Sequence, residues 1–316
     1  MISRPTRVDW LLLLVLGFMW GTSYVFIKIG VQTLPTFTLI ASRLAIGLTV
    51  LATVLFAARE PLPRSPRVYG HLLVMAIVNI VLPFALITTA EVSVDSALAA
   101  ILNGAVPLFV IVFAAFFLHD EPITVNRLVG LVVGYAGVII LVSRSLGSGV
   151  SQSSVEGELA LIASTALYGA GAVYSRRNVR GLRPMVPAFF QVFFAFIIVT
   201  IIAFAFERPL EVSWNASAIG SVVWLGILGS GLAYLLNFRL LARMGATRTS
   251  LVAYLLPVVG IISGALVLDE KVDARVILGT ALVIGGVALV NSRFGERRLF
   301  GRANAGLQNT EGAPKS

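Results

Sequence analysis

Long apolar runs separated by short polar or basic segments dominate the chain. Each run is about as long as the ~20 residues that a helix needs to cross the hydrocarbon core of a bilayer. None shows the alternation of polar and apolar positions that a membrane barrel strand requires. The pattern predicts ten transmembrane helices, over residues 10–30, 36–58, 69–90, 96–118, 127–143, 157–176, 185–206, 216–238, 247–268 and 274–292.

The first apolar run follows a short basic segment, as in a secretory signal peptide. A signal peptide has a short apolar region that ends at a small-residue cleavage site. Here the run continues to Ile29 and the next span follows at once, so we interpret it as a retained span. Because only helices and closed barrels satisfy backbone groups in lipid, the expected fold class is an all-α integral membrane protein.

Composition narrows the possible functions. Apolar residues make up 58% of the chain and charged residues 12%, whereas globular domains average about 25% charged residues. The absence of cysteine excludes disulfides and thiolate metal sites. The sequence contains no Walker A motif, no GxSxG motif and no His–carboxylate cluster at metal-ligand spacing. We therefore expect no enzyme activity, no cofactor and no metal.

The net charge of +9 reflects an uneven distribution of basic residues. Eighteen of the 24 Lys and Arg lie in the two terminal segments and in every second loop. By the positive-inside rule, both termini face the cytoplasm of a bacterial-type inner membrane. Scattered charge of this kind does not favour a nucleic-acid partner. The expected partners are the lipid bilayer and a small-molecule substrate; the oligomeric state stays open, and a monomer is compatible with the sequence.

The two halves of the chain share motifs in register. Trp20-Gly21 corresponds to Tyr168-Gly169, and Pro107 corresponds to Pro257. Five spans per half is an odd number, so the second half enters the membrane in the opposite sense. Inverted repeats of this kind are common in secondary transporters. The predicted organisation is a cytoplasmic N-terminus (1–9), a first repeat (10–143), an outer linker (144–156), a second repeat (157–292) and a disordered cytoplasmic tail (293–316).

These features together resemble a known family. The first span carries WGTSYVFIK, and spans 4 and 9 each have a central proline followed by an acidic pair that ends in Glu121 or Glu270. The combination is similar to the EamA branch of the drug/metabolite transporter superfamily. The resemblance implies ten helices around a central cavity lined by spans 1, 3, 4, 6, 8 and 9, and export or exchange of small metabolites. Gln191 departs from the family pattern, which has an arginine opposite Arg43.

Two basic residues lie within predicted spans. Lys28 and Arg43 both belong to the outer half of the membrane, where charged side chains are costly and are functional candidates by default. One interpretation is that they attract a carboxylate or another anionic group of the substrate. The alternative is that Arg43 caps backbone carbonyls or pairs with Glu91 or Asp95, and that Lys28 snorkels to the interface.

No Asp or Glu is predicted deep inside a span. Glu91 and Asp95 are placed at the outer mouth, whereas a proton-coupled drug exporter usually keeps a central carboxylate. We therefore expect a neutral, zwitterionic or anionic substrate rather than an organic cation. Facilitated diffusion or exchange is favoured, and protonation of a peripheral group stays open.

Further candidates come from prolines, glycines, amides and aromatic residues within the spans. Pro83, Pro107 and Pro257 are expected to break the helical hydrogen-bond ladder, and unwound backbone often lines transporter sites. Gly229 and Gly231 supply a hinge or close packing. The remaining cavity candidates, whose alternative role is packing or interhelical hydrogen bonding, are Trp20, Tyr24, Asn79, Asn103, Tyr168, Gln191, Asn237 and Tyr254.

The favoured function is therefore a secondary transporter that exports or exchanges a small, amino-acid-like metabolite by alternating access. The alternative is a proton-coupled drug efflux protein. A membrane scaffold or a lipid-modifying enzyme is less favoured, because the acidic pairs lie at opposite faces of the membrane.

Overall fold

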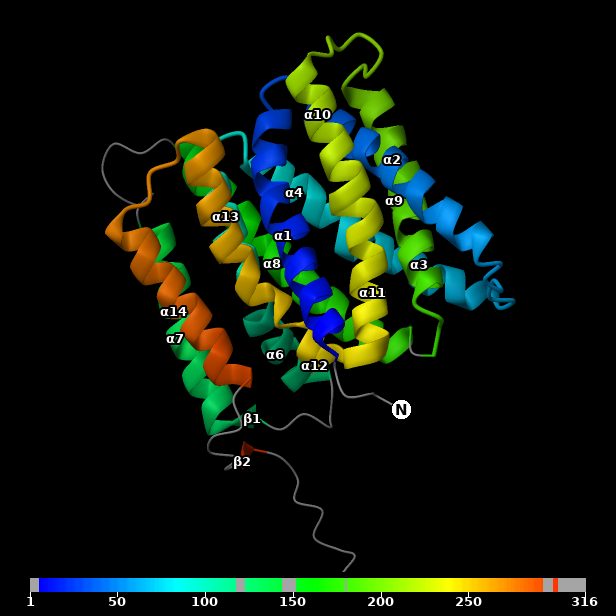
Figure 1. The fold of residues 1–316 in the computed structure, drawn as a ribbon. Helices are drawn as coiled ribbons and strands as arrows, with labels where there is room; N and C mark the ends of the chain where they lie inside the picture. The colour runs from blue at the N-terminus through cyan, green and yellow to red at the C-terminus, as the bar shows by residue number, and fades with distance from the viewer. Residues whose placement is uncertain (1–5, 118–122, 144–151, 180, 292–297, 301–316) are drawn as a thin grey trace, which may run out of the picture.

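The computed structural model is a bundle of long helices (Figure 1), and it describes residues 6–117, 123–143, 152–179, 181–291 and 298–300. Its short strands β1 (Ile123–Thr124) and β2 (Arg298–Phe300) form an antiparallel pair. The helical elements are α1 (Arg7–Gly30), α2 (Thr36–Ala57), α3 (Pro66–Ala76), η1 (Ile77–Val81), α4 (Leu82–Ala90), α5 (Ser96–Gly104), α6 (Val106–Phe117), α7 (Val125–Val142), α8 (Gln152–Asn178), α9 (Met185–Phe206), α10 (Ala216–Trp224), η2 (Leu225–Leu232), α11 (Ala233–Met244), α12 (Ala246–Thr249), α13 (Val252–Leu268) and α14 (Ala274–Asn291).

These helices confirm the predicted all-α membrane class. Within the described ranges, nine helical runs are long and apolar enough to cross a membrane. The helix α8 is long as well and overlaps the predicted sixth span, but it carries more polar residues, among them the buried Ser164 and Thr165. Thr165 donates a hydrogen bond to the backbone carbonyl of Leu102, at 3.2 Å. This polar helix is therefore packed inside the protein against α4, α5 and α6.

Three of the runs are not uniform α-helices. The third run and the seventh run, Ala216–Met244, each contain a π-helical segment, η1 and η2, and Pro83 is the second residue of α4, which follows η1. The fourth run is interrupted between Gly104 and Val106, one residue before Pro107. π segments often occur at functional sites, and they loosen the backbone near the middle of these runs.

The prediction that Pro257 breaks its helix is wrong. α13 continues from Val252 to Leu268 with Pro257 inside it. The proline ring packs on Gly104 of α5, where an added Cβ would lie 2.6 Å from Pro257 Cγ. Gly104 thus leaves room for the proline ring between α5 and α13.

The helix α1 runs through the middle of the bundle, whereas α7 and α14 form a pair at one edge (Figure 1). α1 packs on α13, α10, α11 and α5. The first turn of α1 and the last turn of α14 lie at the same end of the bundle. The buried apolar side chains form two clusters, and Tyr168 of α8 packs against both.

Glycines bring the α7 and α14 backbones into direct contact. A Cβ added at Gly130 would lie 2.6 Å from the carbonyl oxygen of Gly286, and one added at Gly137 would lie 2.7 Å from that of Gly279. Association of helices in lipid depends on such close packing, because no hydrophobic effect drives it. These glycines therefore serve the close packing of α7 on α14.

Carboxylates from distant parts of the chain cap two helices. Glu207, which follows α9, accepts hydrogen bonds from the backbone N–H groups of Phe37 (2.9 Å) and Thr38 (2.7 Å) at the start of α2. Glu270, which follows α13, accepts from the backbone N–H groups of Ser96 (2.7 Å) and Ala97 (2.9 Å) at the start of α5. An anion is stabilised there by the unpaired N–H groups and the helix dipole.

We predict that Gly130→Val lowers the stability of the protein by about 1–3 kcal/mol or more, the usual cost of overpacking. The added side chain meets backbone atoms of α14, which cannot move aside cheaply. Thermal unfolding in detergent measures the effect. Gly285→Ala is the matched control in α14, because nothing lies within 4 Å of its added Cβ; equal loss in both variants would contradict the packing argument.

We predict that Glu207→Gln destabilises the protein by about 1–2 kcal/mol, since it replaces charge-assisted hydrogen bonds to a helix N-terminus with neutral ones. Thermal unfolding again provides the measurement. The control is Glu211→Gln, which removes a nearby carboxylate whose side chain is 70% exposed. If the Glu207 variant is as stable as the Glu211 variant, the helix cap does not contribute to stability.

Candidate functional site

A buried arginine occupies the interior of the bundle. Arg43 of α2 is 4% exposed, and its Nε donates a hydrogen bond to Ser230 Oγ of η2 at 3.2 Å. The guanidinium carbon lies 4.3 Å from the centroid of the Phe84 ring, within the range of a cation–π interaction. The side chain is thus held by a hydroxyl on one helix and an aromatic face on another.

Three tyrosines from three helices surround this arginine. Tyr24 of α1, Tyr168 of α8 and Tyr234 of α11 all lie within electrostatic range of the guanidinium group. Trp20 extends the aromatic wall, because its ring meets that of Tyr234 edge to face at 6.3 Å. We refer to Arg43, Ser230 and the three tyrosines as the arginine cluster.

A glycine lets the η2 backbone approach the arginine cluster. A Cβ added at Gly229 would lie 3.2 Å from Arg43 Nη2 and 2.9 Å from Ser23 Oγ. The neighbouring Gly231 packs in the same way on Val50 of α2. Both glycines belong to the π segment η2. Their contacts support close packing of α2 on η2, which is one of the two roles expected for them, the other being a hinge.

A second polar contact lies between α9 and η1. Asn79 Nδ2 donates to Gln191 Oε1 at 3.3 Å, and Gln191 Nε2 donates to the carbonyl of Pro187 at 2.9 Å. Gln191 stands 148 residues after Arg43, and η2 begins 148 residues after η1. Arg43 and Gln191 thus each make a side-chain contact to a residue of a π-helical segment, Ser230 of η2 and Asn79 of η1.

Lys28 lies in the last turn of α1, and its side chain binds backbone carbonyls. Its Nζ donates to the carbonyl oxygens of Glu91 (2.6 Å) and Val94 (2.9 Å), in the turn that follows α4. This geometry caps carbonyls that have no helical partner. The structure thus gives Lys28 a structural contact that sequence analysis did not consider.

The other candidates are dispersed. Asn103 is buried and donates to the carbonyl of Ala99 in its own helix. Tyr254 donates to the carbonyl of Val287 and so joins α13 to α14, away from the arginine cluster. Asn237 is partly buried on α11, and Glu121 lies outside the described residues.

Sequence analysis missed some members of the site. Ser230 and Phe84 touch Arg43, but neither residue type attracts attention within an apolar span. Tyr234 belongs to the cluster and was not among the candidates. The signal that points to Ser230 is its position between Gly229 and Gly231, since a hydroxyl between two small residues is accessible to a neighbouring helix.

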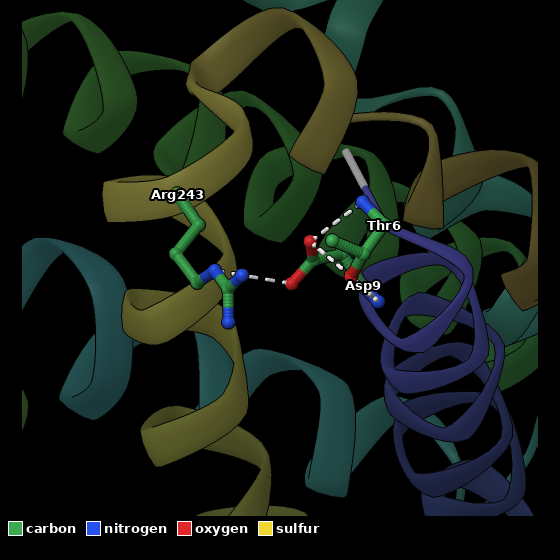
Figure 2. Close-up of polar contacts among 3 residues, drawn as sticks. All are labelled: Thr6, Asp9 and Arg243. Atoms are coloured by element: carbon green, nitrogen blue, oxygen red, sulfur yellow. Dashed lines mark hydrogen bonds and ion pairs between the residues drawn. The ribbon is translucent and has the colours of Figure 1, made fainter. Parts of the chain in front are cut away.

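An ion pair lies at the other end of α1 (Figure 2). Asp9 accepts hydrogen bonds from the backbone N–H and the hydroxyl of Thr6, at 2.9 and 2.8 Å, and so forms a capping box. Its other oxygen lies 3.3 Å from Nε of Arg243 on α11. The central helix is therefore fixed at one end by Asp9 and at the other by Lys28.

Comparison with known proteins identifies the chain. The sequence profile described as "EamA-like transporter family" matches residues 9–143 and again residues 155–292. The protein belongs to the EamA-like transporter family. It is therefore a multi-pass membrane transporter rather than an enzyme.

Proteins with similar sequences come from bacteria and archaea. The chain is 24% identical over 280 residues to "Uncharacterized transporter YoaV" of Bacillus subtilis, covering 89% of this chain and 95% of that protein. It is 25% identical to the "Probable amino-acid metabolite efflux pump" of Escherichia coli, covering 89% and 94%. The chain is also 28% identical to the "Uncharacterized inner membrane transporter YedA" of the same species. The match covers 88% of this chain and 89% of that protein.

A solved structure shares this fold. A crystal structure 24% identical in sequence superposes with a TM-score of 0.67 and covers 90% of this chain and 96% of its own. The likeness concerns the fold alone.

We predict energetic coupling between Asp9 and Arg243. Asp9→Asn and Arg243→Gln should each lower the midpoint of thermal unfolding, and the double variant should lose less than the two single losses combined, because both remove one interaction. Arg177→Gln, an exposed arginine of α8, is the control that should add fully to Asp9→Asn. Full additivity of the Asp9 and Arg243 variants would contradict the ion pair.

Proposed function

We propose that this EamA-like protein is a secondary transporter that exports or exchanges a small amino-acid-like metabolite, and that Arg43 binds its carboxylate. The observation that carries the proposal is the arginine cluster. Among the described residues, Ser230 is the hydrogen-bond partner of Arg43, and a guanidinium group has five N–H donors. A carboxylate or a zwitterion fits the donors that remain.

The surroundings of Arg43 favour a substrate of this class. Tyrosines present both a hydroxyl and an apolar ring, so they suit a ligand with polar and apolar parts. Trp20 adds apolar surface beside Tyr234. The name of the Escherichia coli relative, which refers to amino-acid metabolite efflux, supports the same class of substrate for this chain.

We further propose alternating access between two inverted repeats. Several features recur about 148 residues apart: the segments η1 and η2, and the contacts Arg43–Ser230 and Gln191–Asn79. Packing is also reciprocal, since α1 packs on α13 while α6 packs on α8. The double match of the family profile supports two repeats, near residues 10–143 and 157–292. Two similar halves can exchange conformations around one central site.

The proposed orientation places both termini in the cytoplasm. The positive-inside distribution favours it, and the described chain ends lie at one end of the bundle (Figure 1). The end with Asp9 and Arg243 is then the inner end, and the end with Lys28 and Glu91 is the outer end.

We predict counterflow of labelled amino acids or related metabolites into proteoliposomes that contain the purified protein. Arg43→Gln should reduce this counterflow by about tenfold or more, since a charge-assisted hydrogen bond is worth about 1.5–3 kcal/mol. Arg43→Lys should retain part of the activity, because it keeps the charge.

The control variant is Arg208→Gln, whose side chain is 80% exposed and which should transport normally. Normal counterflow by a folded Arg43→Gln variant would overturn the role of Arg43. Failure of every small metabolite, together with protection of cells against cationic drugs, would favour the drug efflux function instead.

A further inference from the structure

The carboxylate of Glu91 differs from the other acidic side chains at helix ends. Glu207 and Glu270 each cap a helix N-terminus, and Glu60 forms an ion pair with Arg183 at 2.9 Å. Glu91, directly after α4, is 0% exposed, and neither of its carboxylate oxygens has a hydrogen-bond partner among the described residues. Sequence analysis placed this residue at the outer mouth, whereas the structure buries it.

The nearest cation does not neutralise Glu91 directly. Lys28 Nζ donates to the backbone carbonyls of Glu91 and Val94, and no ion pair within 4.0 Å joins it to the carboxylate in the described part of the chain. A buried, unpaired carboxylate is very costly when ionised, so such groups usually become neutral instead. Burial raises the pKa of the Glu91 carboxyl well above its ordinary value, despite the opposing attraction of Lys28.

Charged groups face this site from several elements. Lys28 and Tyr24 belong to α1, and Arg43 belongs to α2. Glu270 adds a second negative charge from the segment after α13 and so disfavours ionisation of Glu91. The start of α8 packs on the same turn through Gly157. The acidic residues on these neighbouring segments are Asp95, Glu156 and Glu158.

We propose that Glu91 is a proton-binding site of the transport cycle. Its carboxyl carries a proton whenever the outer ends of the helices close over it, and it exchanges that proton with water when they open. The proton binds to a carboxylate oxygen and leaves to water, so no other reactant is needed. This proposal rests on the proposed transport function, and it adds a coupling ion to it: because Arg43 lies within electrostatic range of Glu91, loss of the proton alters the field at the substrate site.

Closure of the outer end then depends on pH in a defined direction. The closed form holds one proton more than the open form, so a rise in pH favours opening. By linkage, the ratio of open to closed molecules rises by up to about tenfold per pH unit over the range in which the two forms differ in protonation. Glu91→Gln mimics the protonated group and should abolish this dependence.

Cysteine labelling tests the prediction without knowledge of the substrate. The chain has no native cysteine, so single cysteines can be introduced at Val94, which is 3% exposed, and at Val92, which is 63% exposed in the same turn. A membrane-impermeant maleimide is applied from outside to cells at pH 5.5–8. The rate at Val94→Cys divided by that at Val92→Cys removes the intrinsic pH dependence of the thiol reaction.

We expect this ratio to rise severalfold with pH when Glu91 is present and to stay low and constant in Glu91→Gln. A ratio that keeps the same pH dependence in Glu91→Gln, or that is constant with Glu91 present, would overturn the proposal. Glu211→Gln is the matched control and should leave the wild-type behaviour unchanged.

Thermal unfolding provides a second readout that does not need transport. Since the folded protein holds the proton more tightly than the unfolded chain, wild-type stability falls as pH rises above the ordinary carboxyl range, whereas Glu91→Gln does not share this loss. The melting temperature of Glu91→Gln relative to wild type should therefore increase from pH 5 to pH 8, and an unchanged difference would count against the site. If both readouts behave as expected while no metabolite is transported, the proton site stands and the substrate assignment fails.

Discussion

The absence of water in the hydrocarbon core is the constraint on which the rest of this structure depends. Every polar group that leaves water must find its partner within the protein, and the chain meets this demand mainly at helix ends. Glu207 and Glu270 supply acceptors to the N-termini of α2 and α5, and Lys28 supplies donors to the carbonyls that follow α4. Each of these contacts joins segments that are far apart in the sequence, so capping also fixes how the helices are arranged.

The same constraint explains why the interior holds so few charges and why those present are informative. Arg43 is stabilised by a hydroxyl, an aromatic ring and nearby tyrosines, an environment that also suits an anionic group of a ligand. Close approach of α2 to η2 depends on Gly229 and Gly231, because any larger residue there would collide with α1 or α2. Packing by small residues and placement of the charge are therefore parts of one arrangement.

Much of the fold could be predicted from the sequence, since span length and the absence of deep charges follow directly from the properties of the bilayer. Residues such as Trp20, Tyr24, Arg43 and Tyr168 were identified because aromatic and charged side chains at mid-span are conspicuous. Ser230 and Phe84 were missed because their role depends on which helices meet. Pro257 was misjudged for a related reason: the helix continues through it, and its ring packs on Gly104 of another helix, a contact that only the tertiary structure reveals.

Glu91 shows most clearly what a linear pattern leaves out. Position along the chain places it at the end of a span, where a carboxylate is ordinarily solvated, as with other acidic residues near the loops. Burial is decided instead by the turn after α4, which Lys28 holds against α1 and on which Gly157 of α8 packs. Lys28, for which a substrate contact and a position at the interface were both considered, instead binds this turn, and the Glu91 carboxylate is left without a partner among the described residues. Because a partnerless carboxylate is tolerated only when neutral, the contact that closes this end of the bundle also makes its closure sensitive to protons.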